Sequence, residues 1–151
     1  MEHSIESQKM NRDPILRVGT KILVGPILLF GLYVQFHGDF GPGGGFQAGV
    51  IIAAAFILHS LIFGLKEGRR IVSQSLNMWI MILGVLLYGG VGIVSIFLDG
   101  TFLDYNVLAH DSKHGQHIGI ILIELGVGMT VAGVMLMLFH LFSSWKEDIK
   151  K

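Results

Sequence analysis

Four long runs of apolar residues divide the chain, and each is long enough to cross a membrane as a helix. A spanning helix needs about 20 mostly apolar residues. The predicted spans cover about residues 15–36, 46–65, 76–98 and 118–142. The first span is the weakest, because Arg17 and Lys21 lie in its opening turns, where long basic side chains reach toward the headgroups. The pattern therefore predicts an all-α integral membrane protein with four transmembrane helices.

Composition agrees with a membrane location. Of the 151 residues, 52% are hydrophobic and only 15% are charged, whereas soluble domains carry about 25% charged residues. The 11 basic and 11 acidic residues balance, which argues against a nucleic-acid-binding surface. The sequence has no cysteine, so disulfides and thiolate sites are excluded. Since no catalytic constellation or cofactor motif stands out, we expect neither an enzyme nor a bound cofactor.

The basic residues predict the orientation. Four spans place both termini and the middle loop on one side, and Lys113 is the only Lys or Arg predicted on the other side. Basic loops stay in the cytoplasm, so both termini are expected there. This gives a cytoplasmic N-terminal segment at 1–14, a membrane domain at 15–142 and a basic cytoplasmic tail at 143–151. We interpret the basic clusters as topology signals rather than as lipid-binding sites.

A glycine-rich turn joins the first two predicted spans. The stretch from His37 to Gly49 holds six glycines and one proline, more than the one or two glycines that a tight turn needs. The excess favours a backbone packed closely against another subunit, or lying at membrane depth where protein shields it. Ion coordination by its carbonyls is an alternative. The start of the second helix favours an anion, for which Asp39 is a candidate.

Glu124 is the most informative single residue, because it falls seventh in the last predicted span. At about 1.5 Å per residue it lies roughly 9 Å below the outer boundary. A carboxylate there is unfavourable unless it is paired, hydrated or protonated. Helical steps place it on a small, polar stripe with His117, Gly128 and Ala132, which we expect to pack toward the third span or a partner chain. The functional interpretation is a carboxylate that exchanges protons or cations, and the alternative is a purely structural carboxylate.

Other polar residues complete the candidate ion or proton path. Lys21 and His59 each fall about 9 Å inside the cytoplasmic boundary, as steps of a hydrated path or as unrelated packing residues. The candidates are Glu124, Lys21, His59, His37 and Asp39.

Three histidines, His110, His114 and His117, have a helical spacing that suits a metal site. Gly115 is expected to interrupt any helix there, so loop histidines are favoured and no metal is expected. His140 is expected at the membrane interface.

The block from His37 to Phe46, with Pro42, Gly43, Gly44 and Gly45, resembles the signature of the MnhB/MrpB-type subunits of the multisubunit Mrp/Mnh cation/proton antiporters. The segment at 108–133 is similar to the same family. The resemblance implies a small multi-pass subunit of a bacterial or archaeal cell membrane that works in exchange of Na⁺ for H⁺. It also implies partners, namely large proton-pumping subunits of the complex I type and other small membrane subunits. By this resemblance, we interpret Pro42 to Phe46 as a structural or interface motif. The resemblance identifies no ion-binding residue.

Three alternatives remain open at this point. In the first alternative, the chain is a subunit of the same fold in the sodium-translocating module of a membrane-bound hydrogenase or a related redox complex. A free-standing small transporter would form a dimer around one membrane carboxylate per chain. An assembly-only subunit would make no ion contact.

Overall fold

The computed structural model describes residues 13–38, 43–109 and 111–148, and the regular secondary structure of this part of the chain is all helical. Within these residues, four helices are long and apolar enough to cross a membrane, in agreement with the predicted number of spans. They are α2 (Pro14–Phe36), α3 (Gly45–Phe63), α5 (Gln74–Phe97) and α6 (Ser112–Asp148). A short helix α4 (Leu65–Ile71) and a 3₁₀ turn η1 (Tyr105–Leu108) lie in the connections.

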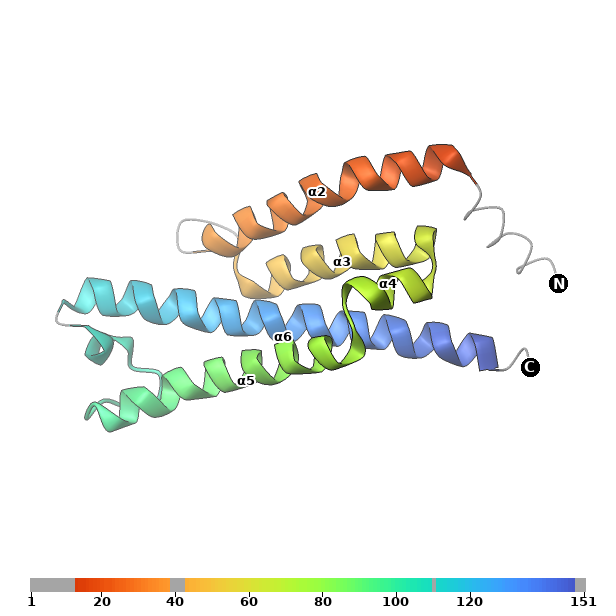
Figure 1. The fold of residues 1–151 in the computed structure, drawn as a ribbon. Helices are drawn as coiled ribbons and strands as arrows, with labels where there is room; N and C mark the ends of the chain where they lie inside the picture. The colour runs from red at the N-terminus through yellow and green to blue at the C-terminus, as the bar shows by residue number, and fades with distance from the viewer. Residues whose placement is uncertain (1–12, 39–42, 110, 149–151) are drawn as a thin grey trace.

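Helix α6 is the centre of the bundle. It packs against α5 on one side and against α3 on the other, and α2 covers the outer face of α3 (Figure 1). The start of α2, the end of α6 and the short helix α4 lie at one end of the bundle. The α5–α6 connection and the junction of α2 with α3 lie at the opposite end. Because the four long helices each run from one end of the bundle to the other, the start of α2 and the end of α6 lie at the same end.

Burial is inverted relative to a water-soluble domain. The side chains with no exposed surface are small, namely Ala48, Ala55 and Ser95. Large apolar side chains point outward instead, with Ile15 79% and Phe97 83% exposed. A continuous apolar surface of this kind is unstable in water and suits lipid or partner helices. Small residues inside allow the helix backbones to approach closely, which stabilises packing where no hydrophobic effect acts between helices.

Local sequence signals set the helix ends. Asp13 caps α2 by accepting a hydrogen bond from the Ile15 amide at 2.9 Å, and Pro14 occupies the first helical position. Ser73 caps α5 through the Leu76 amide at 3.2 Å. Helix α2 continues through Pro26, as packed membrane helices allow.

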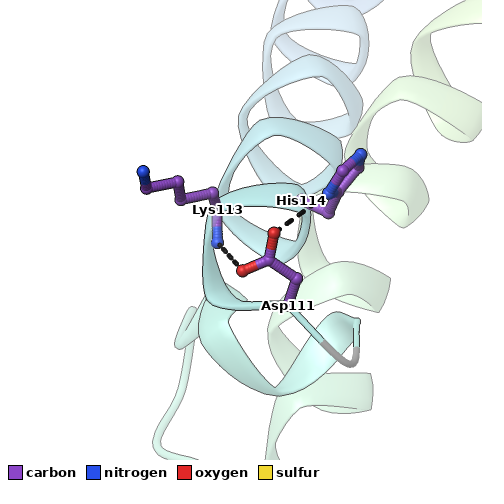
Figure 2. A network of polar contacts seen from close by, with 3 residues as sticks. All are labelled: Asp111, Lys113 and His114. Atoms are coloured by element: carbon purple, nitrogen blue, oxygen red, sulfur yellow. Dashed lines mark hydrogen bonds and ion pairs between the residues drawn. The ribbon is translucent and has the colours of Figure 1, made fainter.

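Helix α6 begins earlier than the sequence suggested. It starts at Ser112, and the prediction that Gly115 interrupts the helix is wrong. The Asp111 carboxylate accepts from the Lys113 amide at 3.3 Å and pairs with His114 at 3.2 Å (Figure 2). Gly115 is buried against the carbonyl of Tyr105, so glycine serves close packing on η1 here. The 37 residues extend about 55 Å, well beyond the ~30 Å of hydrocarbon.

Two glycines bring α5 and α6 together. A Cβ atom added at Gly84 would lie 2.7 Å from the Gly126 carbonyl oxygen, and one added at Gly126 would lie 2.8 Å from the Gly84 carbonyl oxygen. Further along the pair, Asn77 Nδ2 donates to the Gly133 carbonyl at 2.9 Å. The crossing therefore combines backbone contact with a buried interhelical hydrogen bond, as membrane helices often do.

We predict that Gly84→Leu destabilises the chain, because the new side chain would meet the backbone of α6. Overpacking of this kind is unfavourable by about 1–3 kcal/mol. The measurement is the temperature at which the detergent-solubilised protein loses its monodisperse peak in size-exclusion chromatography.

Gly89→Leu on the same helix is the matched control, since an added Cβ there meets nothing within 4 Å in this chain. Equal stability of the two variants would contradict the close crossing.

Candidate functional site

The Glu124 carboxylate lies at the junction of α2 and α3. A Cβ atom added at Gly38, just after α2, would collide with both carboxylate oxygens. One added at Gly44, just before α3, would lie 2.9 Å from Glu124 Oε1. At Gly45 an added Cβ would strike the Glu124 carbonyl oxygen. Three glycines of the predicted glycine-rich turn thus surround one acidic residue of α6.

This placement corrects the expectation that Glu124 packs toward the third span. The sequence pattern pointed the residue toward the third span, which is α5, or toward a partner chain. The glycines of α5 that suggested this do not meet it, because added Cβ atoms at Gly89 and Gly90 find nothing within 4 Å. On the stripe of Glu124, Gly128 and Ala132 are buried and Gly128 packs against α3, as expected, whereas His117 is exposed.

The start of α3 provides a favourable electrostatic environment for an anion. The first-turn amide groups of a helix lack partners within the helix, and the helix dipole gives that end a partial positive charge. Gly44 is the N-cap residue of α3 and has no side chain to accept from these amides. Glu124 lies at this end of the helix, which offsets part of the unfavourable transfer of a carboxylate out of water. The sequence had suggested Asp39 for this role, and that residue falls outside the described part of the chain.

The end of α2 is tied to the start of α3 by a shared carbonyl. Val34 O accepts from the His37 amide at 3.4 Å and from the Gly44 amide at 3.2 Å. An added Cβ at Gly43 would lie 3.0 Å from the same oxygen. These bonds hold the two helix ends at a fixed separation, with the Glu124 carboxylate between them.

Glycine is required at Gly44 for a second reason. Its backbone has φ 111° and ψ 178°, a region that residues with a side chain rarely adopt. The excess of glycines in this turn is therefore explained within the chain itself, by close approach to α6 and by an unusual backbone conformation. Contact with another subunit is not needed to account for Gly44 and Gly45.

Gln35 belongs to the same region, and the sequence interpretation missed it. The side chain is 6% exposed, and its Oε1 atom contacts Gly128, one turn from Glu124 on α6. A polar residue in the last turn of an otherwise apolar span was the available signal. The buried polar region at this end of the bundle thus includes an amide as well as a carboxylate.

The remaining candidates at this end of the bundle lie close by in sequence. His37 follows the last residue of α2, and its ring stacks on Tyr33 with centroids 4.9 Å apart. It directly precedes Gly38, which contacts the Glu124 carboxylate. Pro42 lies outside the described residues, as Asp39 does, whereas Phe46 is 64% exposed on the outside of α3.

Lys21 and His59 are brought together at the other end of the α2–α3 pair. The His59 ring stacks on Phe63 with centroids 4.5 Å apart, and Lys21 Nζ lies 5.9 Å from the centroid of the same ring. Arg17 also lies over this ring, at 5.2 Å. His59 is 14 residues beyond Gly45, about 21 Å along the axis of α3. The structure therefore separates these residues from Glu124.

The three histidines proposed as a possible metal site fall at the start of α6 or outside the described residues. His114 is exposed and pairs with Asp111 at the start of α6 (Figure 2), an exposed contact that adds little stability. His117 lies one turn further along the helix, and His110 falls outside the described residues. His140, which was expected at the membrane interface, lies toward the other end of α6 and is 9% exposed.

The sequence of this chain matches a known protein family. A family model described as a domain related to the MnhB subunit of Na⁺/H⁺ antiporter matches residues 15–137. The chain belongs to the MnhB family. The match confirms the family resemblance that the glycine-rich block suggested. The family consists of transporter subunits rather than enzymes.

Relatives support the same family over most of the chain. A Staphylococcus haemolyticus protein named "Putative antiporter subunit mnhB2" is 38% identical over 141 residues, which cover 89% of this chain and 97% of the relative. Proteins of the same name from Staphylococcus epidermidis and Staphylococcus aureus are 36% and 37% identical, over 82% of this chain and 89% of each relative. An MnhB subunit by its name works with other subunits of a complex.

We predict that Gly44→Ala destabilises this MnhB chain more than Gly64→Ala does. Both glycines have a positive φ, 111° and 96°, so both variants incur backbone strain of about 1–3 kcal/mol. Only at Gly44 does the added Cβ meet the Glu124 carboxylate, since the space at Gly64 is open.

The measurement is the thermal stability and yield of the chain in purified complexes. Gly44→Ala should lose the larger share of both. A loss of the same size in the two variants would show that strain alone matters and that the carboxylate contact does not.

Proposed function

We propose that this chain is a small membrane subunit of a monovalent cation (Na⁺)/proton antiporter complex, and that Glu124 exchanges a proton or cation on the transport route. The observation that carries the proposal is the placement of this carboxylate against the glycine-rich turn. Ionisable residues within membrane spans are unfavourable and usually functional. A carboxylate near a helix N-terminus is stabilised as an anion, yet it can still take up a proton or bind a cation.

The glycine turn supports this role by letting the Glu124 side chain approach the backbone closely. Side chains at Gly38 and Gly44 would occupy the positions next to the carboxylate oxygens. The absence of side chains at these positions lets the carboxylate lie directly against the backbone of the turn, where water or a hydrated ion delivered by partner subunits would reach it from its remaining sides. We propose that the same turn holds α2, α3 and α6 in register, so that the subunit contributes both to assembly and to the route.

The names of the relatives favour an antiporter over the hydrogenase alternative, since the matching proteins are named as antiporter subunits. The assembly-only alternative makes a distinct prediction about Glu124, which the following experiment tests.

We predict that Glu124→Gln lowers Na⁺-driven proton movement in everted membrane vesicles by about a hundredfold or more, the lower end of what a positioned proton-transfer group contributes. Glutamine keeps the size of the side chain but neither releases a proton nor binds a cation by charge. The amount of assembled complex, measured by co-purification with a tagged partner subunit, should stay unchanged.

Glu67→Gln is the matched control, because Glu67 is an exposed glutamate of the short helix α4. Its activity should equal that of the wild type. Full antiport by an intact Glu124→Gln complex would leave only the assembly role.

We also propose that the chain lies in the cell membrane with both termini on the cytoplasmic side. The basic residues at the end of the bundle that holds α4 support this orientation. The absence of native cysteine allows a direct test with single cysteine variants. Lys66 and Lys113 are both exposed and lie at opposite ends of the bundle. Lys113→Cys should react with a membrane-impermeant maleimide in intact cells, and Lys66→Cys only after permeabilisation. The reverse labelling pattern would overturn the orientation.

A further inference from the structure

We propose that a cavity between α4, α5 and α6 binds the phosphate group of an anionic phospholipid. The cavity has a volume of about 200 Å³ and is lined by Arg69, Gln74, Asn77, Met78, Met137, His140, Leu141 and Ser144. It lies at the end of the bundle opposite Glu124, where α5 begins and α6 nears its end (Figure 1). It is therefore separate from the proposed transport site.

Two polar residues that line the cavity carry side-chain atoms without a hydrogen-bond partner. Asn77 is 3% exposed and His140 is 9% exposed. Among the described residues, neither Asn77 Oδ1 nor His140 Nε2 has a hydrogen-bond partner. Buried polar atoms without partners are rare in folded proteins and indicate a bound molecule or water. A headgroup with hydroxyl and phosphate oxygens supplies both a donor for Asn77 and an acceptor for His140.

Arg69 gives the cavity a positive charge in a fixed position. Its Nη2 atom donates to Ser144 Oγ, and that hydroxyl donates to the His140 carbonyl at 2.8 Å. The two bonds anchor α4 to the last turns of α6 and hold the guanidinium beside the cavity. None of the described lining residues is acidic, so the site favours an anion. A guanidinium is well suited to phosphate because its planar donors match the phosphate oxygens.

The apolar residues that line the cavity face outward. Met78 is 52% exposed, Met137 36% and Leu141 54%. These side chains lie on helices that span the membrane, so lipid or a partner helix covers them. A site with a polar, cationic floor and an apolar outer wall at the end of a span fits an amphiphile better than free phosphate. For Arg69, this adds a binding role to the topology signal that the sequence indicates for the basic residues.

The neighbouring residue provides a matched control. Arg69 and Arg70 are consecutive in α4 and both are exposed, but only Arg69 lines the cavity. An arginine that attracts anionic lipid only through the surface potential contributes about fivefold in affinity. A charged hydrogen bond within a site contributes about tenfold or more.

The test uses the intact complex, purified and reconstituted in phosphatidylcholine vesicles that contain a fluorescent phosphatidylglycerol. Arg69→Gln should weaken phosphatidylglycerol binding by about tenfold or more, and Arg70→Gln by no more than about fivefold. Met78→Trp, which fills the mouth of the cavity without a change of charge, should also weaken binding. It provides a second result if Arg69→Gln does not assemble.

Two outcomes would overturn the proposal. Equal losses in Arg69→Gln and Arg70→Gln, with no loss in Met78→Trp, would show general surface attraction or a cavity filled by a partner subunit. Displacement of the lipid by millimolar inorganic phosphate would show a site for free phosphate instead.

Discussion

The contact between the Glu124 carboxylate and the backbone of the α2–α3 junction determines how this bundle is built. A charged group in the interior of a membrane protein needs compensation, and here the compensation comes from the N-terminal end of α3. The carboxylate can lie there only because Gly38, Gly44 and Gly45 leave the space that side chains would fill. The same close approach seats α3 on α6 through Gly49 and Gly128, where an added Cβ at Gly49 would lie 2.7 Å from the Gly128 carbonyl oxygen. The position of the Glu124 carboxylate thus requires glycine at these places in the turn.

The polar chemistry of the chain is divided between the two ends of the bundle. Glu124, Gln35 and His37 lie at the α2–α3 junction, whereas Lys21 and His59 meet around Phe63 at the far end of α3. The intervening length of α3 is about 21 Å. These candidate residues do not form one continuous polar file within the described part of the chain. A transport route that uses both ends therefore needs groups from other subunits, which agrees with a chain that belongs to a family of complex subunits.

The sequence predicted the helices well, because hydrophobic length alone identifies a membrane span. It failed where a residue's role depends on a neighbour that is distant in sequence. Gly115 suggested the end of a helix, yet it lies inside α6 because the backbone of η1 needs the space. Helical spacing correctly turned the Glu124 stripe toward protein, but spacing cannot say which helix lies opposite, and the partner proved to be the α2–α3 junction rather than α5. The cavity beside Arg69 was beyond prediction for the same reason, since three separate helices form it.

The most direct test of the account is a cryo-electron microscopy structure of the whole complex at a resolution that shows ordered water. We predict a hydrated passage that reaches the Glu124 carboxylate beside Gly38 and Gly44. A carboxylate enclosed on every side by apolar groups of neighbouring subunits, with no water or ion within hydrogen-bond distance, would contradict it.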